Sequence, residues 1–148
     1  MQSRLLFILM ALALGAVLPM QAAINVRLAK TAGNPVMAAF ISFAVGTIAL
    51  LIFLLIAGQF QFKFISSSSP WWIWTGGLLG TFFVAGIVAL LPRLGVMLSF
   101  SLVLAGQMFA AILFDQFGWL SVAVREISPG KIIGAILLIV GVVLIRKY

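Results

Sequence analysis

Five long apolar stretches, separated by short polar breaks, make up most of the 148-residue chain. Each stretch is long enough to cross the hydrocarbon core of a bilayer, which takes about 20 helical residues. The pattern predicts an all-α, polytopic membrane protein in which residues 1–148 form a single transmembrane domain. The expected helices cover approximately residues 5–27, 35–57, 70–91, 95–117 and 129–146.

Polar residues and prolines mark the expected helix boundaries. Asn34-Pro35, Ser69-Pro70 and Ser128-Pro129 precede three of the five stretches. An Asn or Ser side chain can accept a hydrogen bond from a free amide of the first turn, where Pro is also tolerated because no donor is needed. We expect Pro92, in contrast, to end the third helix and to begin the tight turn before Gly95.

Two segments admit a second interpretation. The first stretch follows Arg4, as a signal peptide would, but it is longer than a signal core and precedes no small-residue cleavage site. We therefore expect a retained helix. The connection at residues 58–69 alternates polar residues with Phe before four serines, which could form a short strand. The phenylalanines fit better as side chains that dip into the membrane interface, beside Trp71, Trp72 and Trp74.

Composition supports the membrane assignment and excludes several functions. Hydrophobic residues are 65% of the chain, charged residues 7%, and the mean hydropathy is +1.33. The net charge of +7 comes from scattered basic residues between the apolar stretches, where they meet lipid headgroups rather than nucleic acid. The chain has neither Cys nor His, which removes the usual metal sites and thiol or His catalysis. We expect no metal, no cofactor and no enzymatic activity.

Basic residues are divided almost evenly between the two sides of the predicted membrane domain. One side carries Arg4, Lys63, Arg125 and Lys131, and the other carries Arg27, Lys30, Arg93, Arg146 and Lys147. Orientation follows the Lys/Arg difference, which is only one here, and this balance predicts insertion in both orientations. The alternative is that helix hydrophobicity or a partner fixes one orientation. Two oppositely inserted five-helix chains would form a ten-helix, inverted-pair transporter fold.

Amide side chains within the expected helices are candidate substrate-binding groups. Gln21 and Asn25 share one face of the first helix, and Gln107 is the deepest amide, near the middle of the fourth. Each of them either binds substrate or forms an interhelical hydrogen bond that only helps assembly. Trp72 and Trp74 either form the wall of one mouth of the transport path or belong to the aromatic belt at the interface.

Glycine and proline suggest a gate and an interface. Pro19 removes the amide that would bond the Gly15 carbonyl, which predicts a kink in the first helix that could act as a gate. Gly134 and Gly141 lie seven residues apart on one face of the fifth helix. Small residues at such spacing allow close helix packing, either within one chain or across a dimer.

Asp115 is the only acidic residue in any expected helix. It lies near the end of the fourth helix, where we expect an interfacial carboxylate that is solvated or paired with a nearby Lys or Arg. No acid or His lies at the midplane to carry a proton or to neutralise a cation. We therefore expect a neutral, zwitterionic or anionic cargo.

An ordered set of short motifs carries a family resemblance. The set comprises Gln21-Ala22-Ala23-Ile24-Asn25, Asn34-Pro35, Ile41-Ser42-Phe43-Ala44-Val45-Gly46-Thr47, Trp74-Thr75-Gly76-Gly77-Leu78-Leu79-Gly80, Leu94-Gly95, Ala105-Gly106-Gln107 and Asp115-Gln116-Phe117-Gly118. Over nearly its whole length the chain resembles the short, five-helix bacterial inner-membrane branch (YdcZ-like) of the drug/metabolite transporter superfamily. The resemblance implies a multi-pass transporter subunit of the bacterial inner membrane. Its implied partners are a second copy or a paralogue and a small-molecule substrate.

The fifth stretch is also similar to the last helix of small multidrug resistance transporters, where glycines seven apart pack an antiparallel dimer. This similarity implies an interface role for Gly134 and Gly141. Those transporters carry a Glu in the first helix that exchanges substrate for protons, whereas residues 11–16 here are all Ala, Leu or Gly. Their proton-coupled drug export is therefore not expected of this chain.

Three other functions compete with transport. A non-transporting subunit that stabilises or regulates a larger membrane complex would use the same glycine faces. A passive pore fits less well, because few charges line the expected helices. An enzyme fits least, since the chain contains no nucleophile–base pair and no metal cluster.

Overall fold

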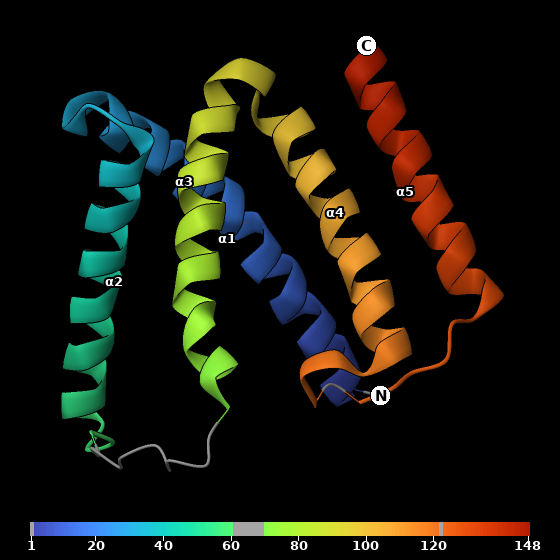
Figure 1. Cartoon of the computed structure of the whole chain (residues 1–148), viewed down its shortest axis with the longest axis horizontal. Coiled ribbons are helices and arrows are strands. Elements are labelled where there is room, and N and C mark those ends of the chain that lie inside the picture. Colours follow the sequence, from blue (N-terminus) through green and yellow to red (C-terminus); the bar gives the residue numbers. More distant parts are fainter. Residues whose placement is uncertain (1, 61–69, 122) are drawn as a thin grey trace. The chain divides into compact units, whose positions relative to one another are not determined.

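A computed structural model describes residues 2–60, 70–121 and 123–148, and it shows an all-helical chain over those ranges (Figure 1). Five long helices follow in order: α1 (Gln2–Ala32), α2 (Pro35–Ile56), α3 (Gly76–Leu94), α4 (Val96–Phe117) and α5 (Pro129–Lys147). Short 3-10 turns, η1 (Trp71–Thr75) and η2 (Trp119–Ser121), precede α3 and follow α4. The strand alternative and the interfacial phenylalanines of the second connection fall largely on residues 61–69, outside the described residues.

All five helices are long and apolar enough to cross a membrane, as the sequence predicts; η1 and α3 together form the third span, Trp71–Leu94. In the most apolar window of each span, only 6% of the residues of α1, α2, α4 and α5 are buried, and 17% of those of the third span. A water-soluble bundle would bury its Leu, Ile and Phe side chains. The exposed apolar surface of these helices is therefore suited to contact lipid or another membrane helix.

Two of the three predicted helix starts are confirmed by their capping bonds. The Asn34 Oδ1 atom accepts a hydrogen bond from the Met37 amide at 2.8 Å, and Pro35 occupies the first turn of α2. The Ser128 Oγ atom accepts one from the Lys131 amide at 3.4 Å at the start of α5. Ser69 lies outside the described residues.

Two helix ends differ from the sequence prediction. Helix α1 continues past Arg27 to Ala32 and stops before Gly33, whose φ of +93° is unfavourable for residues with a side chain. The prediction that Pro92 ends the third helix is wrong, because α3 continues to Leu94 and stops before Gly95, at φ +76°. A proline in the last turn removes one amide but does not prevent the next residues from staying helical.

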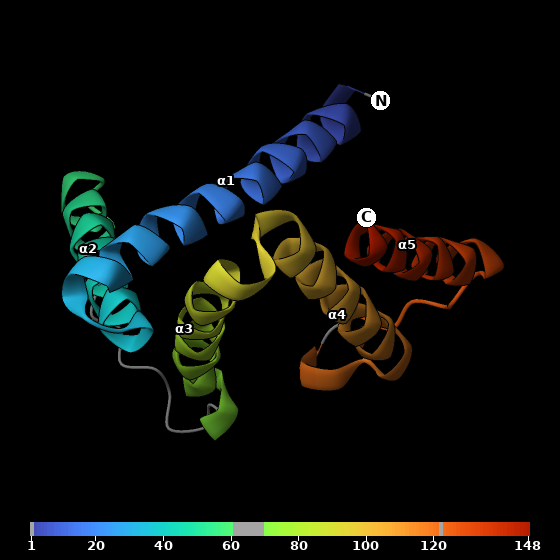
Figure 2. The ribbon, with the colours of Figure 1, turned by 90° about the horizontal axis from the view of Figure 1, so that it is seen from above.

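The chain forms two compact units, Met1–Arg93 (unit 1) and Leu94–Tyr148 (unit 2). In unit 1, α1 and α2 pack against each other close to their shared turn, and the amino-terminal half of α1 extends away from α2 (Figure 2). Every described side chain from Arg4 to Leu18 is exposed. The buried apolar residues of unit 1 come from all three of its helices: Ala22, Ala38, Ala39, Val84, Ile87, Val88 and Leu91.

Helices α4 and α5 pack against each other in unit 2. Gly118, at φ +61°, ends α4, and its amide donates to the Phe114 carbonyl at 2.9 Å. The Phe117 and Trp119 rings stack at a centroid distance of 5.3 Å beside this turn. This aromatic cluster closes the end of α4, where the interface of a membrane domain is expected.

Candidate functional site

A cavity of about 250 Å³ opens between α1 and α2, at Gln21. We call it the Gln21 cavity; its described lining residues are Gln21, Ser42, Phe43, Gly46, Thr47 and Leu50. At about 1.5 Å per residue, Gln21 and Gly46 each lie about 16 Å along their helices from the shared turn. For a turn at the membrane boundary and helices along the membrane normal, this distance corresponds to about half of the 30 Å apolar core of a bilayer.

The spacing of small and polar residues on α2 creates this opening. Ser42, Gly46 and Leu50 are four residues apart and share one face of the helix, with Gly46 leaving room where a side chain would stand. The Thr47 hydroxyl donates to the Phe43 carbonyl at 2.8 Å, so its oxygen remains able to accept a hydrogen bond. The Gln21 amide can both donate and accept. The cavity therefore offers uncharged hydrogen-bonding groups to a polar ligand.

Asn25 lies one turn further along α1, and its burial is unusual for an amide in an apolar setting. The residue is 3% exposed, and its Nδ2 atom has no hydrogen-bond partner among the described residues. A buried polar group without a partner costs about 1–3 kcal/mol. A ligand or a rearranged helix that supplied an acceptor to this amide would recover that cost.

Gln107 belongs to a different unit from Gln21 and Asn25. It lies on α4, in unit 2, and its side chain is exposed, whereas Gln21 and Asn25 are both on α1 in unit 1. An exposed amide on an apolar helix is available to a neighbouring helix or chain.

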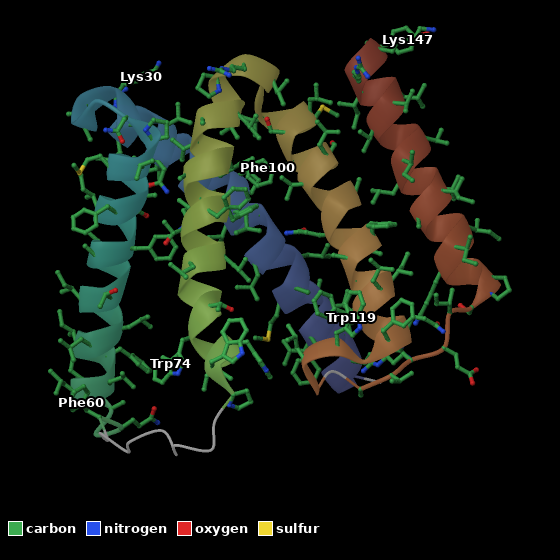
Figure 3. All side chains as sticks on the ribbon, viewed as in Figure 1. Lys30, Phe60, Trp74, Phe100, Trp119 and Lys147 are labelled. Atoms are coloured by element: carbon green, nitrogen blue, oxygen red, sulfur yellow. The ribbon has the colours of Figure 1, made fainter. Side chains whose placement is uncertain are left out.

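The two predicted tryptophans belong to the 3-10 turn before α3. Trp74 is 65% exposed, Trp72 is half-buried, and neither is among the described residues that line the Gln21 cavity. Figure 3 shows Trp74 near the opposite end of unit 1 from Lys30, which follows the apolar part of α1. Both predicted roles, aromatic belt and wall of a mouth, are compatible with a position at the end of a spanning helix.

The predicted gate and interface residues lie in uncrowded parts of their helices. Helix α1 runs through Pro19 without interruption, and a Cβ atom added to Gly15 would meet no described atom within 4 Å outside its own part of the helix. The same is true of Gly134 and Gly141 on α5. These two glycines therefore have room for another helix to approach their backbone.

Asp115 is paired, as one of the sequence interpretations states. The Lys131 Nζ atom lies 3.3 Å from Asp115 Oδ2 and donates to the Glu126 carbonyl at 3.1 Å. The Arg125 amide also donates to the Asp115 carbonyl at 2.8 Å. These bonds join the end of α4 to the start of α5, so Asp115 has a local partner in unit 2.

Sequence reasoning missed Ser42, Gly46 and Thr47 as site residues, although their segment contributes to the family resemblance. The available signal was the four-residue spacing of Ser42, Gly46 and Leu50, which places two small residues on one helix face. Only the packing of α1 against α2 shows that this face meets Gln21.

Five helices long and apolar enough to span a membrane, with an apolar surface, are the features of a multi-pass membrane protein. Comparison with known proteins agrees. Residues 6–144 match the family described as "Putative inner membrane exporter, YdcZ". The chain is 31% identical over 147 residues to "Inner membrane protein YdcZ" of Escherichia coli (strain K12), covering 99% of this chain and 97% of that protein.

The chain therefore belongs to the YdcZ family within the drug/metabolite transporter superfamily, and it is a multi-pass protein of the bacterial inner membrane. The family description names a transporter rather than an enzyme. No solved structure matches the chain.

Proposed function

We propose that this protein exports a small neutral, zwitterionic or anionic metabolite by alternating access, as a dimer of two oppositely inserted chains. The observation that carries the proposal is the Gln21 cavity, because an amide and two hydroxyl groups line it in an otherwise apolar span. It lies about 16 Å along α1 and α2 from their shared turn, which is midplane depth for a turn at the membrane boundary. Transporters of inverted-repeat design bind their substrates at that depth. The cavity volume of about 250 Å³ fits a small metabolite or one part of a larger one.

The charge of the proposed cargo follows from the distribution of acids. Residues 1–93 contain neither Asp nor Glu, so no carboxylate of unit 1 can neutralise a cation in the Gln21 cavity. Asp115, the acid in the fourth span, is paired with Lys131. A cationic cargo would have to cross the apolar core without a fixed countercharge, which is costly. Amide and hydroxyl groups suit neutral, zwitterionic or anionic polar groups instead.

Three features support the dimer. A five-helix chain has its two ends on opposite sides of a membrane, and its Lys/Arg balance of four against five gives weak orientation bias. The amino-terminal half of α1 is exposed along its length, and the Gly134–Gly141 face of α5 has room for a neighbouring helix. Gln107, Trp72 and Trp74 would then line the path with Gln21 and Asn25, while the segment from Gly15 to Pro19 would serve as the gate.

Transport into inside-out inner-membrane vesicles tests the proposal. Vesicles containing the protein are incubated with a panel of radiolabelled amino acids, sugars and organic acids, beside vesicles without it. We expect saturable uptake of at least one of these compounds, and its loss in Gln21→Leu, because Leu cannot hydrogen-bond within the cavity. Gln59→Leu is the matched control, since this Gln is exposed just beyond α2 and does not line the cavity.

The rival is a non-transporting subunit of a larger membrane complex, for which the exposed half of α1 would be the docking surface. It predicts that the protein is isolated with a different membrane protein and transports none of the panel. Isolation as a lone dimer whose thermal stability rises with a transported compound would contradict it.

A further inference from the structure

A second cavity in unit 1 lies at the turn between α1 and α2 and has a different character from the Gln21 cavity. Its volume is about 310 Å³, and its lining comes from the end of α1, the turn Gly33-Asn34-Pro35 and the end of α3. Lys30 and Arg93 line it together with apolar residues, among them Val26, Val88 and Pro92. We call it the Lys30–Arg93 cavity.

The two basic side chains have no carboxylate of their own unit to pair with. Residues 1–93 contain no acid, and Lys131–Asp115 is the ion pair found among the described residues. Two cations that line one cavity repel each other unless an anion lies between them. The cavity therefore presents positive charge that no acid of unit 1 neutralises.

The position of the cavity indicates which anions can reach its two basic residues. Lys30 is in the last turn of α1, Pro35 is in the first turn of α2, and Arg93 is in the last turn of α3. These three helix ends lie at the same end of unit 1, where Figure 3 places Lys30. The ends of spanning helices lie at the membrane–water boundary, where the phosphates of phospholipids are found.

The rest of the lining distinguishes a lipid from a free anion. Val26, Val88, Ala89 and Pro92 form an apolar wall beside the two cations. A dissolved phosphate would gain nothing from this wall, whereas the glycerol and first acyl carbons of a phospholipid would be buried against it. The amino end of α2 adds a weak positive potential on the same side.

We propose that the Lys30–Arg93 cavity binds the phosphate headgroup of an anionic membrane phospholipid. The Arg93 guanidinium can hold two phosphate oxygens at once, and the Lys30 ammonium supplies a second charge. The bound lipid joins the end of α3 to the turn between α1 and α2. This role is separate from the proposed transport through the Gln21 cavity.

Native mass spectrometry of the full-length protein, released from phosphatidylcholine nanodiscs that contain a minor fraction of phosphatidylglycerol, tests the proposal. We expect the wild type to retain phosphatidylglycerol selectively. The double variant Lys30→Gln/Arg93→Gln should retain about twenty-five-fold less, because each basic residue contributes about a factor of five to binding an anionic headgroup. The matched control is Arg146→Gln/Lys147→Gln, which removes two cations from the end of α5 and should keep wild-type retention.

Equal retention by the double variant, or an equal loss in the control, would overturn the proposal, because the attraction would then be general to basic residues at the interface. A second measurement uses the wild type alone, so that it does not depend on whether the double variant folds. Phosphatidylglycerol should raise the melting temperature of the wild-type protein relative to phosphatidylcholine alone. Absence of that rise would also overturn the proposal. Inorganic phosphate in phosphatidylcholine nanodiscs should produce no rise; an equal rise would assign the cavity to free phosphate and contradict a lipid site.

Discussion

Asn25 offers a test in which stability and transport are expected to move in opposite directions. Replacing it by Leu keeps a side chain of similar length but removes a buried amide whose Nδ2 atom has no partner among the described residues. An unsatisfied buried polar group costs about 1–3 kcal/mol, so Asn25→Leu should raise the free energy of unfolding by about 1 kcal/mol or more. If this amide serves the substrate, the same variant should lose transport.

The unfolding free energy is measured by titrating the purified protein with SDS in mixed micelles at one fixed protein concentration. Ser99→Ala is the matched control, because Ser99 is 2% exposed and its hydroxyl already donates to the Gly95 carbonyl at 2.6 Å. Removing a satisfied hydroxyl should lower stability by about 0.5–1 kcal/mol. The two variants therefore separate the removal of an unpaired polar group from the removal of a paired one.

A loss of stability in Asn25→Leu as large as that in Ser99→Ala would refute the reasoning. It would mean that the Asn25 amide has a structural partner in the membrane-embedded protein, and that its burial gives no reason to assign it to a substrate. A gain in stability with unchanged transport would keep the energetic argument and remove Asn25 from the proposed site.

Three further substitutions test other parts of the account. Gly80→Ala should be tolerated, because its Cβ would lie 3.4 Å from the Phe43 Cζ atom, an ordinary van der Waals contact. Gly80→Val should lower the free energy of unfolding by about 1–3 kcal/mol. It should also reduce vesicle transport, because the larger side chain would push the Phe43 ring towards the Gln21 cavity. Pro19→Ala should return a donor to the Gly15 carbonyl, stabilise α1 by about 1 kcal/mol or more in SDS titration, and slow transport if this segment is the gate. Gly141→Leu should change monomer stability by no more than about 0.5 kcal/mol, because its side chain enters open space, yet it should abolish the dimer detected by cross-linking in liposomes. Stable dimers of Gly141→Leu would contradict the assigned interface, and fast transport by Pro19→Ala would contradict the gate.

The sequence predicts the helices well because their signal is local. About 20 consecutive apolar residues suffice to identify a span, and a polar residue before Pro identifies its start, as Asn34 and Ser128 show. The predicted end of the third helix at Pro92 is wrong, because the local signal of a proline is weaker than that of a glycine with positive φ. A proline forbids one hydrogen bond, but Gly95, with its positive φ, sets the boundary two residues later than expected.

The candidate site was less predictable because it depends on how helices pack. The sequence marks Gln21 as a polar residue in an apolar stretch, but only the pairing of α1 with α2 shows that Ser42 and Thr47 face the same opening. Lys30 and Arg93 are sixty-three residues apart in the sequence, where each has the position of an ordinary basic residue at the membrane interface. Their meeting in one cavity becomes visible only when the ends of α1 and α3 are placed in space.

The orientation of the chain in the inner membrane tests the antiparallel dimer most directly. The chain has no Cys, so a single Cys added after Tyr148 can be labelled in intact cells with a membrane-impermeant maleimide and compared with fully permeabilised cells. The near-even Lys/Arg balance predicts that about half of the molecules are labelled in intact cells. Labelling of all or of none would show a single orientation and contradict a dimer built from two oppositely inserted copies of this chain.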